Sequence, residues 1–399
     1  MTQMKEPRIE FELTGMAHGG SAIGRHNGKA IFVPYAIAGE TIAARIVEDK
    51  GNFARGELAE VITPSENRVE PPCRHFGKCG GCNWQHIRYE AQLEFKRQIV
   101  FDQLSRIGGI KDAVVHPTIA SPDEWRYRSH VNFHRTHNGQ LGFVMTDDRT
   151  VMAIEECHII RPELGELFGK FNQQGVKPEH KRVRLQVGSE SQEILAASNV
   201  GDETGSEETR TILGSGKVHY TIKGHVFEVT AGSFFQVNLP QAETLVNLVL
   251  ERLALQGTEH VLDLYSGVGL FTAFLAPQAR KVTAIESYPP AVNDAKVNLA
   301  KFTNIKLLQG TAEQMLTRFL QGHFDAAVID PPRTGMKPAA LEELMKCQPS
   351  KLVYVSCDPA TLGRDTKKLV GSGYQLVDVQ PVDMFPQTYH IESVATFIR

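Results

Sequence analysis

The chain lacks any run of about 18 consecutive apolar residues, the length that a membrane-spanning helix requires. Its first residues, MTQMKEPRIE, are charged where a secretory signal peptide would carry an apolar stretch. It also lacks the cysteine density of a small disulfide-stabilised domain, since six cysteines occur in 399 residues. We therefore expect a cytoplasmic protein that contacts no membrane, with roughly two or three domains of ordinary globular composition.

The chain has no excess of positive charge either. Lysines and arginines number 43, aspartates and glutamates number 46, and the formal net charge is −3. This balance argues against a protein coated in nucleic acid, because nonspecific affinity comes from basic side chains that neutralise phosphates. Any contact with RNA must therefore be local.

The best local candidate for RNA contact is Trp125–His137, which contains no acidic residue. Read as a strand, it places basic or polar side chains on one face and apolar side chains on the other. The first face comprises Arg126, Arg128, His130, Asn132 and His134, and the second Tyr127, Val131 and Phe133. A solvated edge strand is the alternative interpretation of the same pattern.

Three of the six cysteines, Cys73, Cys79 and Cys82, lie within ten residues in CRHFGKCGGCNWQH. Cys157 in EECHII is a possible fourth ligand. Such a group indicates an iron–sulfur cluster or zinc in a reduced compartment, and the spacing does not choose between them. His75 and His86 keep a mixed zinc site open.

Three regions differ in pattern along the chain. Residues 1–64 show short strands separated by glycines, which predicts a small β-barrel. Residues 65–232 contain the cysteines, an amphipathic helix over 89–107 and then mostly β-like runs. Residues 233–399 alternate strands with helices, which predicts a parallel α/β sheet. The strands we expect there are HVLDLYS, KVTAIES, IKLLQ, FDAAVID and KLVYVS, followed by a hairpin of LVDVQPV and SVATFIR.

The third region carries the pattern of a cofactor site. DLYSGVGLF places Gly267 and Gly269 directly after a strand and before a helix, where bare backbone can approach a ligand. Glu286 ends the next strand, where an acidic side chain commonly binds ribose hydroxyls. The third glycine of a dinucleotide fingerprint is missing, so S-adenosylmethionine is favoured, although the spacing alone leaves a folate donor open. Asp330, in DPPR at the end of another strand, faces the same crevice.

Cys357 in VSCDP lies where an apolar strand runs into a helix-forming segment, at the edge of the sheet that binds ligands. A helix N-terminus stabilises a thiolate, so we expect Cys357 to be a nucleophile. The plainer alternative is a buried cysteine that serves as a small hydrophobic residue.

Taken together, these motifs resemble the RumA-type 23S ribosomal RNA (uracil-5-)-methyltransferases. FFQVN, DLYSGVGLF, DPPR, VSCDP and the terminal PQTYHIE appear in the order of that family, behind the cysteine segment. The resemblance covers nearly the whole chain. It implies a TRAM β-barrel, a central domain with a 4Fe-4S cluster and a Rossmann-like methyltransferase domain, with the 89–107 helix packed on the last.

The resemblance also implies roles for individual residues. Gln236, Tyr265, Glu286 and Asp330 would line the S-adenosylmethionine pocket beside Gly267. Cys357 would be the nucleophile that adds to uracil carbon 6, and Glu392 the general base, with His390 a weaker candidate for that role. Cys73, Cys79, Cys82 and Cys157 would hold the cluster, with zinc as the alternative.

Two other functions stay open at this point. One is the same reaction on transfer RNA, although transfer-RNA members of the wider group typically lack the barrel and the cysteine segment, which favours ribosomal RNA. The other is a noncatalytic RNA-binding or ribosome-assembly factor, against which the presence of both Cys357 and Glu392 argues. We expect a monomer whose partner is RNA.

Overall fold

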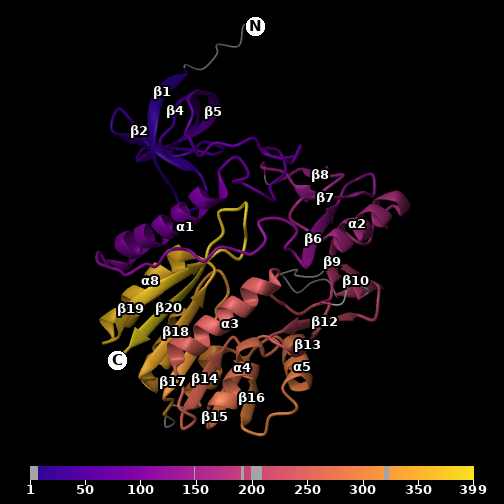
Figure 1. Ribbon diagram of the computed structural model, residues 1–399, viewed down its shortest axis with the longest axis vertical. Coiled ribbons are helices and arrows are strands. Elements are labelled where there is room, and N and C mark those ends of the chain that lie inside the picture. The colour runs from indigo at the N-terminus through magenta and orange to yellow at the C-terminus, as the bar shows by residue number, and fades with distance from the viewer. Residues whose placement is uncertain (1–7, 148, 190–192, 199–208, 319–322) are drawn as a thin grey trace.

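The computed structural model contains a β-barrel and two larger sheets, one for each region of the sequence (Figure 1). It describes residues 8–147, 149–189, 193–198, 209–318 and 323–399. In the view of Figure 1 the barrel lies at the top, the central sheet at the right and the C-terminal sheet at the bottom. Among these residues, none of the helices has the length and apolar character needed to span a membrane.

The N-terminal barrel closes in the strand order β1-β2-β3-β5-β4, as the glycine-punctuated pattern predicted. Alternate side chains point inward, so that Leu13, Ile31 and Val33 are buried. The strands are β1 (Ile9–Met16), β2 (Ala22–His26), β3 (Lys29–Val33), β4 (Thr41–Asp49) and β5 (Phe53–Thr63). The predicted TRAM-like barrel is confirmed.

A helix that follows the cysteine segment packs against the C-terminal region. It comprises α1 (Tyr89–Gln103) and one π-helical turn (Leu104–Gly108), which contacts α8 (Pro359–Gly371). Its buried face includes Lys96, whose Nζ donates to Asp383 Oδ1 at 2.6 Å. The predicted apolar spacing located this helix, but the buried lysine was not foreseen.

The central region forms a six-stranded sheet in the order β11-β10-β9-β6-β7-β8, covered by α2 (Pro162–Gln174), and a separate β12-β13 pair. Phe133 of β6 stacks on Phe168 of α2 with ring centroids 4.8 Å apart, which places the core between helix and sheet. The strands are β6 (His130–Arg135), β7 (Leu141–Val144), β8 (Val151–Ala153), β9 (Arg182–Val187), β10 (Ile194–Ser198), β11 (Arg210–Leu213), β12 (Lys217–Ile222) and β13 (His225–Thr230).

The prediction of a half-buried strand with a basic outer face over Trp125–His137 was only partly right, and the alternative of an edge strand was wrong, because β6 lies between β9 and β7. The strand begins at His130, so strand alternation does not apply to the residues before it. His130 itself is buried, with 6% of its surface exposed, and desolvation lowers its pKa well below the usual value. Arg128 Cζ lies 5.8 Å from the centre of the Phe385 ring. Much of this basic segment therefore packs inside the protein.

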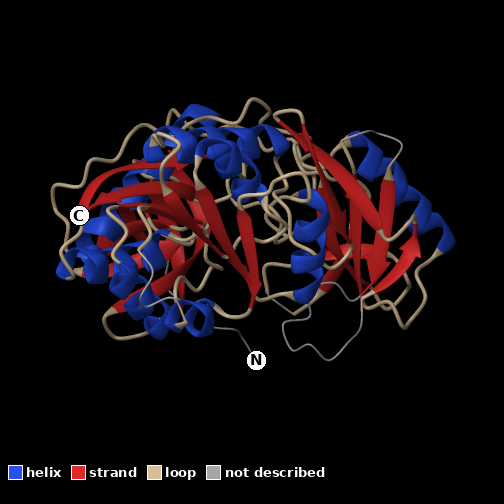
Figure 2. Cartoon of the chain, turned by 90° about the horizontal axis from the view of Figure 1, so that it is seen from below, coloured by secondary structure: helices blue, strands red, loops and turns tan. Residues whose placement is uncertain are grey.

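The C-terminal sheet has seven strands in the order β16-β15-β14-β17-β18-β20-β19, with β20 antiparallel to both of its neighbours and the first five strands parallel. Helices lie on both of its faces (Figure 2). The strands are β14 (His260–Leu264), β15 (Lys281–Glu286), β16 (Ile305–Gln309), β17 (Ala326–Ile329), β18 (Lys351–Ser356), β19 (Gln375–Val382) and β20 (Glu392–Ile398).

The other helices of this region are α3 (Leu239–Leu253), α4 (Leu270–Leu275) with the 3-10 turn Ala276–Gln278, α5 (Pro289–Asn298), α6 (Ala312–Thr317) and α7 (Pro338–Cys347). Strand–helix alternation confirms the predicted α/β fold with its terminal hairpin. The inner parallel strands are nearly continuous apolar runs because helices cover both faces.

Candidate active site

The strand order of the C-terminal sheet reverses at β14, and the switch point between β14 and β17 lies at the carboxyl edge of the sheet. From β14 the chain moves outward to β15 and β16, and then returns to the other side of β14 as β17. Such a reversal of strand order is where α/β proteins bind ligands. The loop after β14 carries Tyr265 and Gly267, and the loop after β17 begins at Asp330. Three of the residues singled out in the sequence are therefore at one edge.

The loop after β14 adopts backbone conformations that suit glycine. Gly267 and Gly269 have φ angles of 54° and 95°, and Tyr265 also has a positive φ of 63°, which is uncommon for a residue with a side chain. A Cβ on Gly269 would come within 2.9 Å of Leu299 Cδ1, whereas nothing lies within 4 Å of one on Gly267. Packing explains Gly269, and Gly267 faces open space.

Glu286 ties this loop to the end of β15. Its Oε2 accepts a hydrogen bond from Gly267 N at 3.0 Å, and its Oε1 accepts from Ser287 N and Tyr288 N, both at 2.7 Å. Ser266 Oγ, in contrast, is buried without a hydrogen-bond partner among the described residues. An unpartnered buried hydroxyl in a glycine loop fits the binding of a polar ligand.

Two carboxyl groups lie at the switch point between β14 and β17. Burial raises the pKa of Asp263 on β14 to about 7, and burial together with the charge of Asp263 raises the pKa of Asp330 to about 7 as well. Asp263 Oδ2 accepts a hydrogen bond from Thr272 Oγ1, and its Oδ1 has no partner within the described ranges. Asp263 lies in the motif DLYSG, but nothing in the motif distinguished it as a site residue.

Cys357 directly follows β18, and Glu392 is the first residue of the neighbouring strand β20. Ser356 of β18 pairs with Ser393 of β20, so Cys357 and Glu392 lie near each other just beyond this last pair of the antiparallel ladder. Glu392 is 3% exposed, and burial and then the nearby Asp330 raise its pKa well above the usual value. The structure thus brings the predicted nucleophile, the predicted base and one predicted cofactor residue together.

The electrostatic surroundings of Cys357 differ from the sequence expectation. Burial, followed by the negative charges of Glu392, Asp330 and Asp358, raises the pKa of the Cys357 thiol to about 12. The guanidinium of Arg333 opposes this shift. Since carboxylates surround the thiol, the start of α8 does not by itself make Cys357 a thiolate in the protein alone.

Gln236 and His390 reach the region from other segments. Gln236 is buried just before α3, whose first turn is capped by Asn238. His390 precedes β20 rather than lying in it, and its ring centroid is 4.4 Å from that of Tyr389. Burial, and then the positive charge of Arg333, lower the pKa of His390 to about 3, so its imidazole is neutral.

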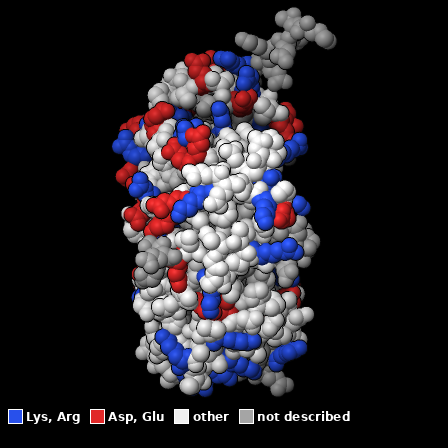
Figure 3. Space-filling model, turned by 90° about the vertical axis from the view of Figure 1, so that its right-hand side faces the viewer, with Lys and Arg blue, Asp and Glu red and all other residues white. Residues whose placement is uncertain are grey.

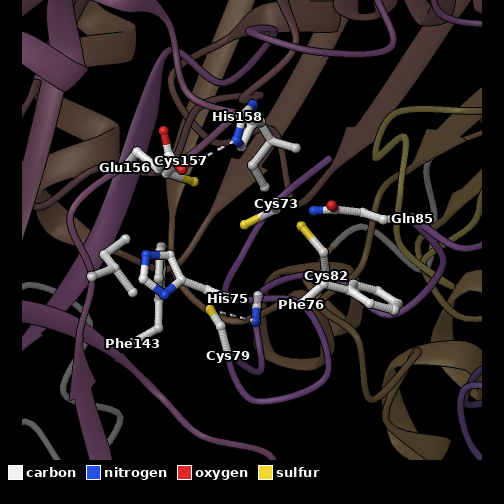
Figure 4. Close-up of a pocket in the computed structure, with 13 residues that line it drawn as sticks. Cys73, His75, Phe76, Cys79, Cys82, Gln85, Phe143, Glu156, Cys157 and His158 are labelled. Atoms are coloured by element: carbon white, nitrogen blue, oxygen red, sulfur yellow. Dashed lines mark hydrogen bonds and ion pairs between the residues drawn. The ribbon is translucent and has the colours of Figure 1, made fainter. Parts of the chain in front are cut away.

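The four predicted metal ligands line one pocket between the barrel and the central sheet. Figure 4 shows the sulfur atoms of Cys73, Cys79, Cys82 and Cys157 around a common space. Within the part of the chain that the structure describes, no three His, Cys, Asp or Glu side chains converge closely enough to bind a single metal ion.

Burial opposes ionisation of two of these thiols, Cys82 and Cys157. Desolvation, and then the charge of Cys157, raise the pKa of Cys82 to about 12, and desolvation raises the pKa of Cys157 to about 11. The positive charge of Arg128 acts on both thiols in the opposite direction. A bound metal would have to displace these protons, and four thiol donors are the ligand set of an iron–sulfur cluster.

The outer surface agrees with the nearly balanced composition. On the side shown in Figure 3, basic and acidic side chains are interspersed in the upper part, a broad uncharged area lies in the middle, and lysines and arginines predominate in the lower part. This pattern is consistent with local rather than general contact with RNA.

Comparison with known proteins identifies the family. The profile of the tRNA (uracil-5-)-methyltransferases matches residues 212–399, and that of the TRAM domain matches residues 3–59. An uncharacterized RNA methyltransferase of Halalkalibacterium halodurans is 34% identical over 98% of this chain and 97% of its own length. Another, of Clostridium tetani, is 35% identical over 98% of this chain and 96% of its own length. The chain belongs to the RNA (uracil-5-)-methyltransferase family.

A solved structure of the same family matches the whole fold. The tRNA (uracil-54, C5)-methyltransferase of Pyrococcus abyssi, in complex with S-adenosyl-L-homocysteine, superposes with a TM-score of 0.75 at 25% identity. The match covers 98% of this chain and 99% of that one, so it includes the barrel and the central region. An N-terminal barrel therefore does not distinguish ribosomal from transfer-RNA enzymes in this family, contrary to the expectation from the sequence.

Sequence reasoning missed several residues of this methyltransferase-family site. Asp358 and Arg333 lie within the quoted motifs VSCDP and DPPR, yet only their neighbours were assigned roles. His18 and Lys96 come from segments 340 and 287 residues away from the groups that they contact. Motif position could have identified the first pair, whereas only the fold reveals the second.

Proposed function

We propose that this protein methylates carbon 5 of a uracil in 23S ribosomal RNA, producing 5-methyluridine with S-adenosylmethionine as the donor. The observation that carries the proposal is the position of Cys357 near Glu392 and Asp330 at the carboxyl edge of the sheet. A nucleophile and a carboxyl base at one point are what this reaction requires.

The donor would bind at the switch point between β14 and β17. Gln236, Tyr265, Gly267, Glu286 and Asp330 are the residues we assign to it, and the open space at Gly267 supports this placement. When bound, S-adenosylmethionine supplies the methyl group and a positive sulfonium charge. The carboxyl groups around the switch point favour a cationic ligand over a phosphate-bearing one.

Cys357 would activate the uracil ring, because carbon 5 is too weak a nucleophile to accept a methyl group unaided. The Cys357 thiolate forms a bond to carbon 6, and the electron pair of the 5,6 double bond moves toward the carbonyl at carbon 4. Carbon 5 would then form a bond to the methyl carbon of the donor, while the bond from that carbon to the sulfonium sulfur breaks and its electron pair stays on the sulfur of S-adenosylhomocysteine. Arg333, the cation that favours the Cys357 thiolate, stabilises negative charge at this rim.

Glu392 would complete the reaction by removing the proton from carbon 5. The electron pair of that C–H bond restores the 5,6 double bond, and the bond between carbon 6 and the Cys357 sulfur breaks to regenerate the thiolate. A carboxylate whose pKa is raised by burial and by Asp330 is a stronger base than an exposed one. Once Glu392 passes this proton to water, the protein is back in its starting state.

The choice of ribosomal RNA rests on the order of motifs from the cysteine segment to PQTYHIE, which resembles the ribosomal branch of the family. Transfer RNA is the second candidate, favoured by the whole-length likeness to the Pyrococcus abyssi enzyme. In either RNA the target base must leave its stack before the sulfur can reach carbon 6.

The cysteine pocket would hold a 4Fe-4S cluster through Cys73, Cys79, Cys82 and Cys157. Four cysteine side chains that line one pocket are a ligand set that a 4Fe-4S cluster uses, and the single zinc ion that the spacing also allowed is the alternative. Its place is structural, since the proposed reaction transfers no electron. Arg128 would connect it to the loop before β20 through Phe385.

The test is methyl transfer from radiolabelled S-adenosylmethionine to unmodified 23S ribosomal RNA and to unmodified transfer RNA, followed by nucleoside analysis. We expect label in 5-methyluridine of the ribosomal RNA. Label in transfer RNA alone would show that transfer RNA is the substrate and would leave the proposed reaction unchanged. Label in a different nucleoside, or in neither RNA, would overturn the proposed function.

A further inference from the structure

A turn of the N-terminal barrel reaches the residue next to the proposed nucleophile. The turn is Ala17–Ser21 between β1 and β2, and His18 Nε2 lies 3.2 Å from Asp358 Oδ2. The side chain of His18 is 28% exposed and that of Asp358 is 10% exposed, so the contact is mostly shielded from water. Two residues 340 positions apart thus meet beside Cys357.

The turn is fixed in this place by independent contacts. Ala17 N donates to Ser21 O at 2.8 Å, which closes the turn. Gly20 O accepts a hydrogen bond from Nε1 of the buried Trp84 at 2.9 Å. Gly20 has a φ of 89°, and a Cβ there would come within 2.8 Å of the Tyr389 ring. The turn is therefore packed tightly against the segment that leads to Glu392.

Asp358 uses its two carboxylate oxygens for different purposes. Oδ1 accepts hydrogen bonds from Ala360 N at 3.0 Å and Thr361 N at 2.9 Å, which caps α8. Oδ2 faces His18 at 3.2 Å and Arg333 Nε at 3.8 Å. Because a carboxylate only accepts hydrogen bonds, His18 must donate through Nε2–H.

This arrangement affects Cys357 in two ways. Asp358 directly follows Cys357, so fixing the Asp358 side chain from both oxygens also fixes the backbone that presents the sulfur. The negative charge of Asp358 acts against a Cys357 thiolate. The Nε2–H of His18 solvates that carboxylate by a hydrogen bond, and the guanidinium of Arg333, with a side chain 56% exposed, opposes its charge from farther away.

We infer that His18 is a positioning residue for methyl transfer, and that the barrel turn Ala17–Ser21 forms part of the catalytic site. His18 holds Asp358, and Asp358 orients Cys357 and the start of α8. This inference rests on the proposed function and adds to it: the barrel contributes to the chemical step in addition to any contact that it makes with RNA.

The test measures the rate at which Cys357 forms a covalent adduct with substrate RNA containing 5-fluorouridine. Fluorine at carbon 5 cannot leave as a proton, so the adduct persists and is counted on a denaturing gel. We expect His18→Ala to slow adduct formation by about 10- to 100-fold, as for loss of a positioning group, with the KM for RNA within about threefold of wild type. His18→Asn, which keeps a side-chain N–H donor, should recover part of the rate.

A double-variant cycle separates positioning from direct contact with RNA. If His18 acts through Asp358, the variant with both His18→Ala and Asp358→Asn is no slower than Asp358→Asn alone. His26→Ala, in the same barrel, is the matched control and should react at the wild-type rate. Gly20→Ala is the second variant, in case His18→Ala folds poorly. It pushes the turn away from Tyr389, so we expect it to slow adduct formation as His18→Ala does.

Three results would overturn the inference: a wild-type rate in His18→Ala, a defect confined to the KM for RNA, or effects that multiply in the double variant. Absence of adduct in the wild-type protein with both ribosomal and transfer RNA would instead refute the proposed function. The two failures are therefore distinguishable.

Discussion

Cys357 directly follows β18 and lies near Glu392, the first residue of β20, just beyond the last pair of the β18–β20 ladder, Ser356 and Ser393. Main-chain hydrogen bonds of a buried sheet therefore set the separation of the proposed nucleophile and base. Groups held on rigid strands keep their relative geometry better than groups on loops. We make a separate prediction for each residue of this pair.

Replacing Cys357 with alanine removes the sulfur that forms the bond to carbon 6. We expect methyl transfer to fall by at least about 10³-fold and the 5-fluorouridine adduct to disappear. The measurement is incorporation of labelled methyl groups into RNA under single-turnover conditions. Cys347→Ala, at another buried free cysteine, is the control and should remain active. Full methylation by Cys357→Ala would contradict the assignment.

Replacing Glu392 with glutamine removes the base but keeps the size of the side chain. Methyl transfer to carbon 5 can still occur, whereas proton removal cannot, so a methylated RNA–protein adduct should accumulate. We expect product release to slow by about 10²- to 10⁴-fold. Denaturing gels with label in the methyl group detect the adduct. Glu342→Gln, exposed on α7, is the control; release of free methylated RNA at the wild-type rate by Glu392→Gln would disprove its role.

Asp263 should make the stability of the ligand-free protein fall as the pH rises. Its pKa rises from 3.8 to about 7 on folding, so the folded state holds the proton more tightly than the unfolded state does. The resulting stabilisation is complete below about pH 4 and is lost as the pH rises through about 7. The difference in free energy of unfolding between Asp263→Asn and wild type should therefore shift in favour of Asp263→Asn by at least about 1.4 kcal/mol from pH 4 to pH 8.

Urea denaturation of both proteins at several pH values measures this difference. Asp112→Asn, at an exposed position, supplies the control and should show the pH dependence of the wild type. An equal pH dependence in Asp263→Asn and wild type would show that Asp263 is ionised in the folded protein at neutral pH.

The ion pair of Lys96 and Asp383 is fully buried. We expect removal of one partner to destabilise the fold, and removal of both partners to be tolerated. Lys96→Met leaves the Asp383 carboxylate buried without its partner, and we expect the free energy of unfolding to fall by about 3–5 kcal/mol. Adding Asp383→Leu should restore most of that loss, because two apolar side chains need no partner. Trp84 reports the change by fluorescence, since Lys96 Nζ lies 5.8 Å from its ring centre.

The control for this pair is Lys111→Met, an exposed lysine whose replacement should change stability by less than about 0.5 kcal/mol. Equal stability of Lys96→Met and wild type would show that the Asp383 carboxylate does not require this partner.

Removing one thiol from the cysteine pocket should prevent cluster assembly. We expect anaerobically purified wild-type protein to contain about four iron and four sulfide per chain, as for a 4Fe-4S cluster, and Cys82→Ser to contain little of either. Metal and sulfide analysis with visible absorption provides the measurement. Cys347→Ser should retain the cluster. One zinc and no sulfide in the wild-type protein would favour the alternative that the cysteine spacing left open.

Local sequence patterns predicted those helices and strands whose position depends on their own residues rather than on distant contacts. The runs IKLLQ and KLVYVS became β16 and β18 without a change of boundary. β18 is a nearly continuous apolar run because both of its faces are covered, whereas β16 lies at the edge of the sheet and exposes Lys306 and Gln309. The hairpin that ends the sheet followed from two β-like runs close together. Motif order likewise placed Cys357 at the ligand-binding edge.

Long-range contacts explain what the sequence could not predict. Lys96 lies on the buried face of α1, because its partner Asp383 is supplied by a distant loop. Arg128 packs over Phe385 rather than facing water, for a similar reason. The pKa of Cys357 depends on carboxyl groups from three other positions, so the dipole at the start of α8 was an incomplete guide.

The strand order β18-β20-β19 has a consequence for how the chain is made. β19 joins the sheet only through β20, although β19 is synthesised first. Until β20 leaves the ribosome, β18 presents an open edge that can pair with the wrong partner. The strand that closes this edge also carries Glu392, so a nascent chain acquires its proposed base in the same folding event that completes its sheet.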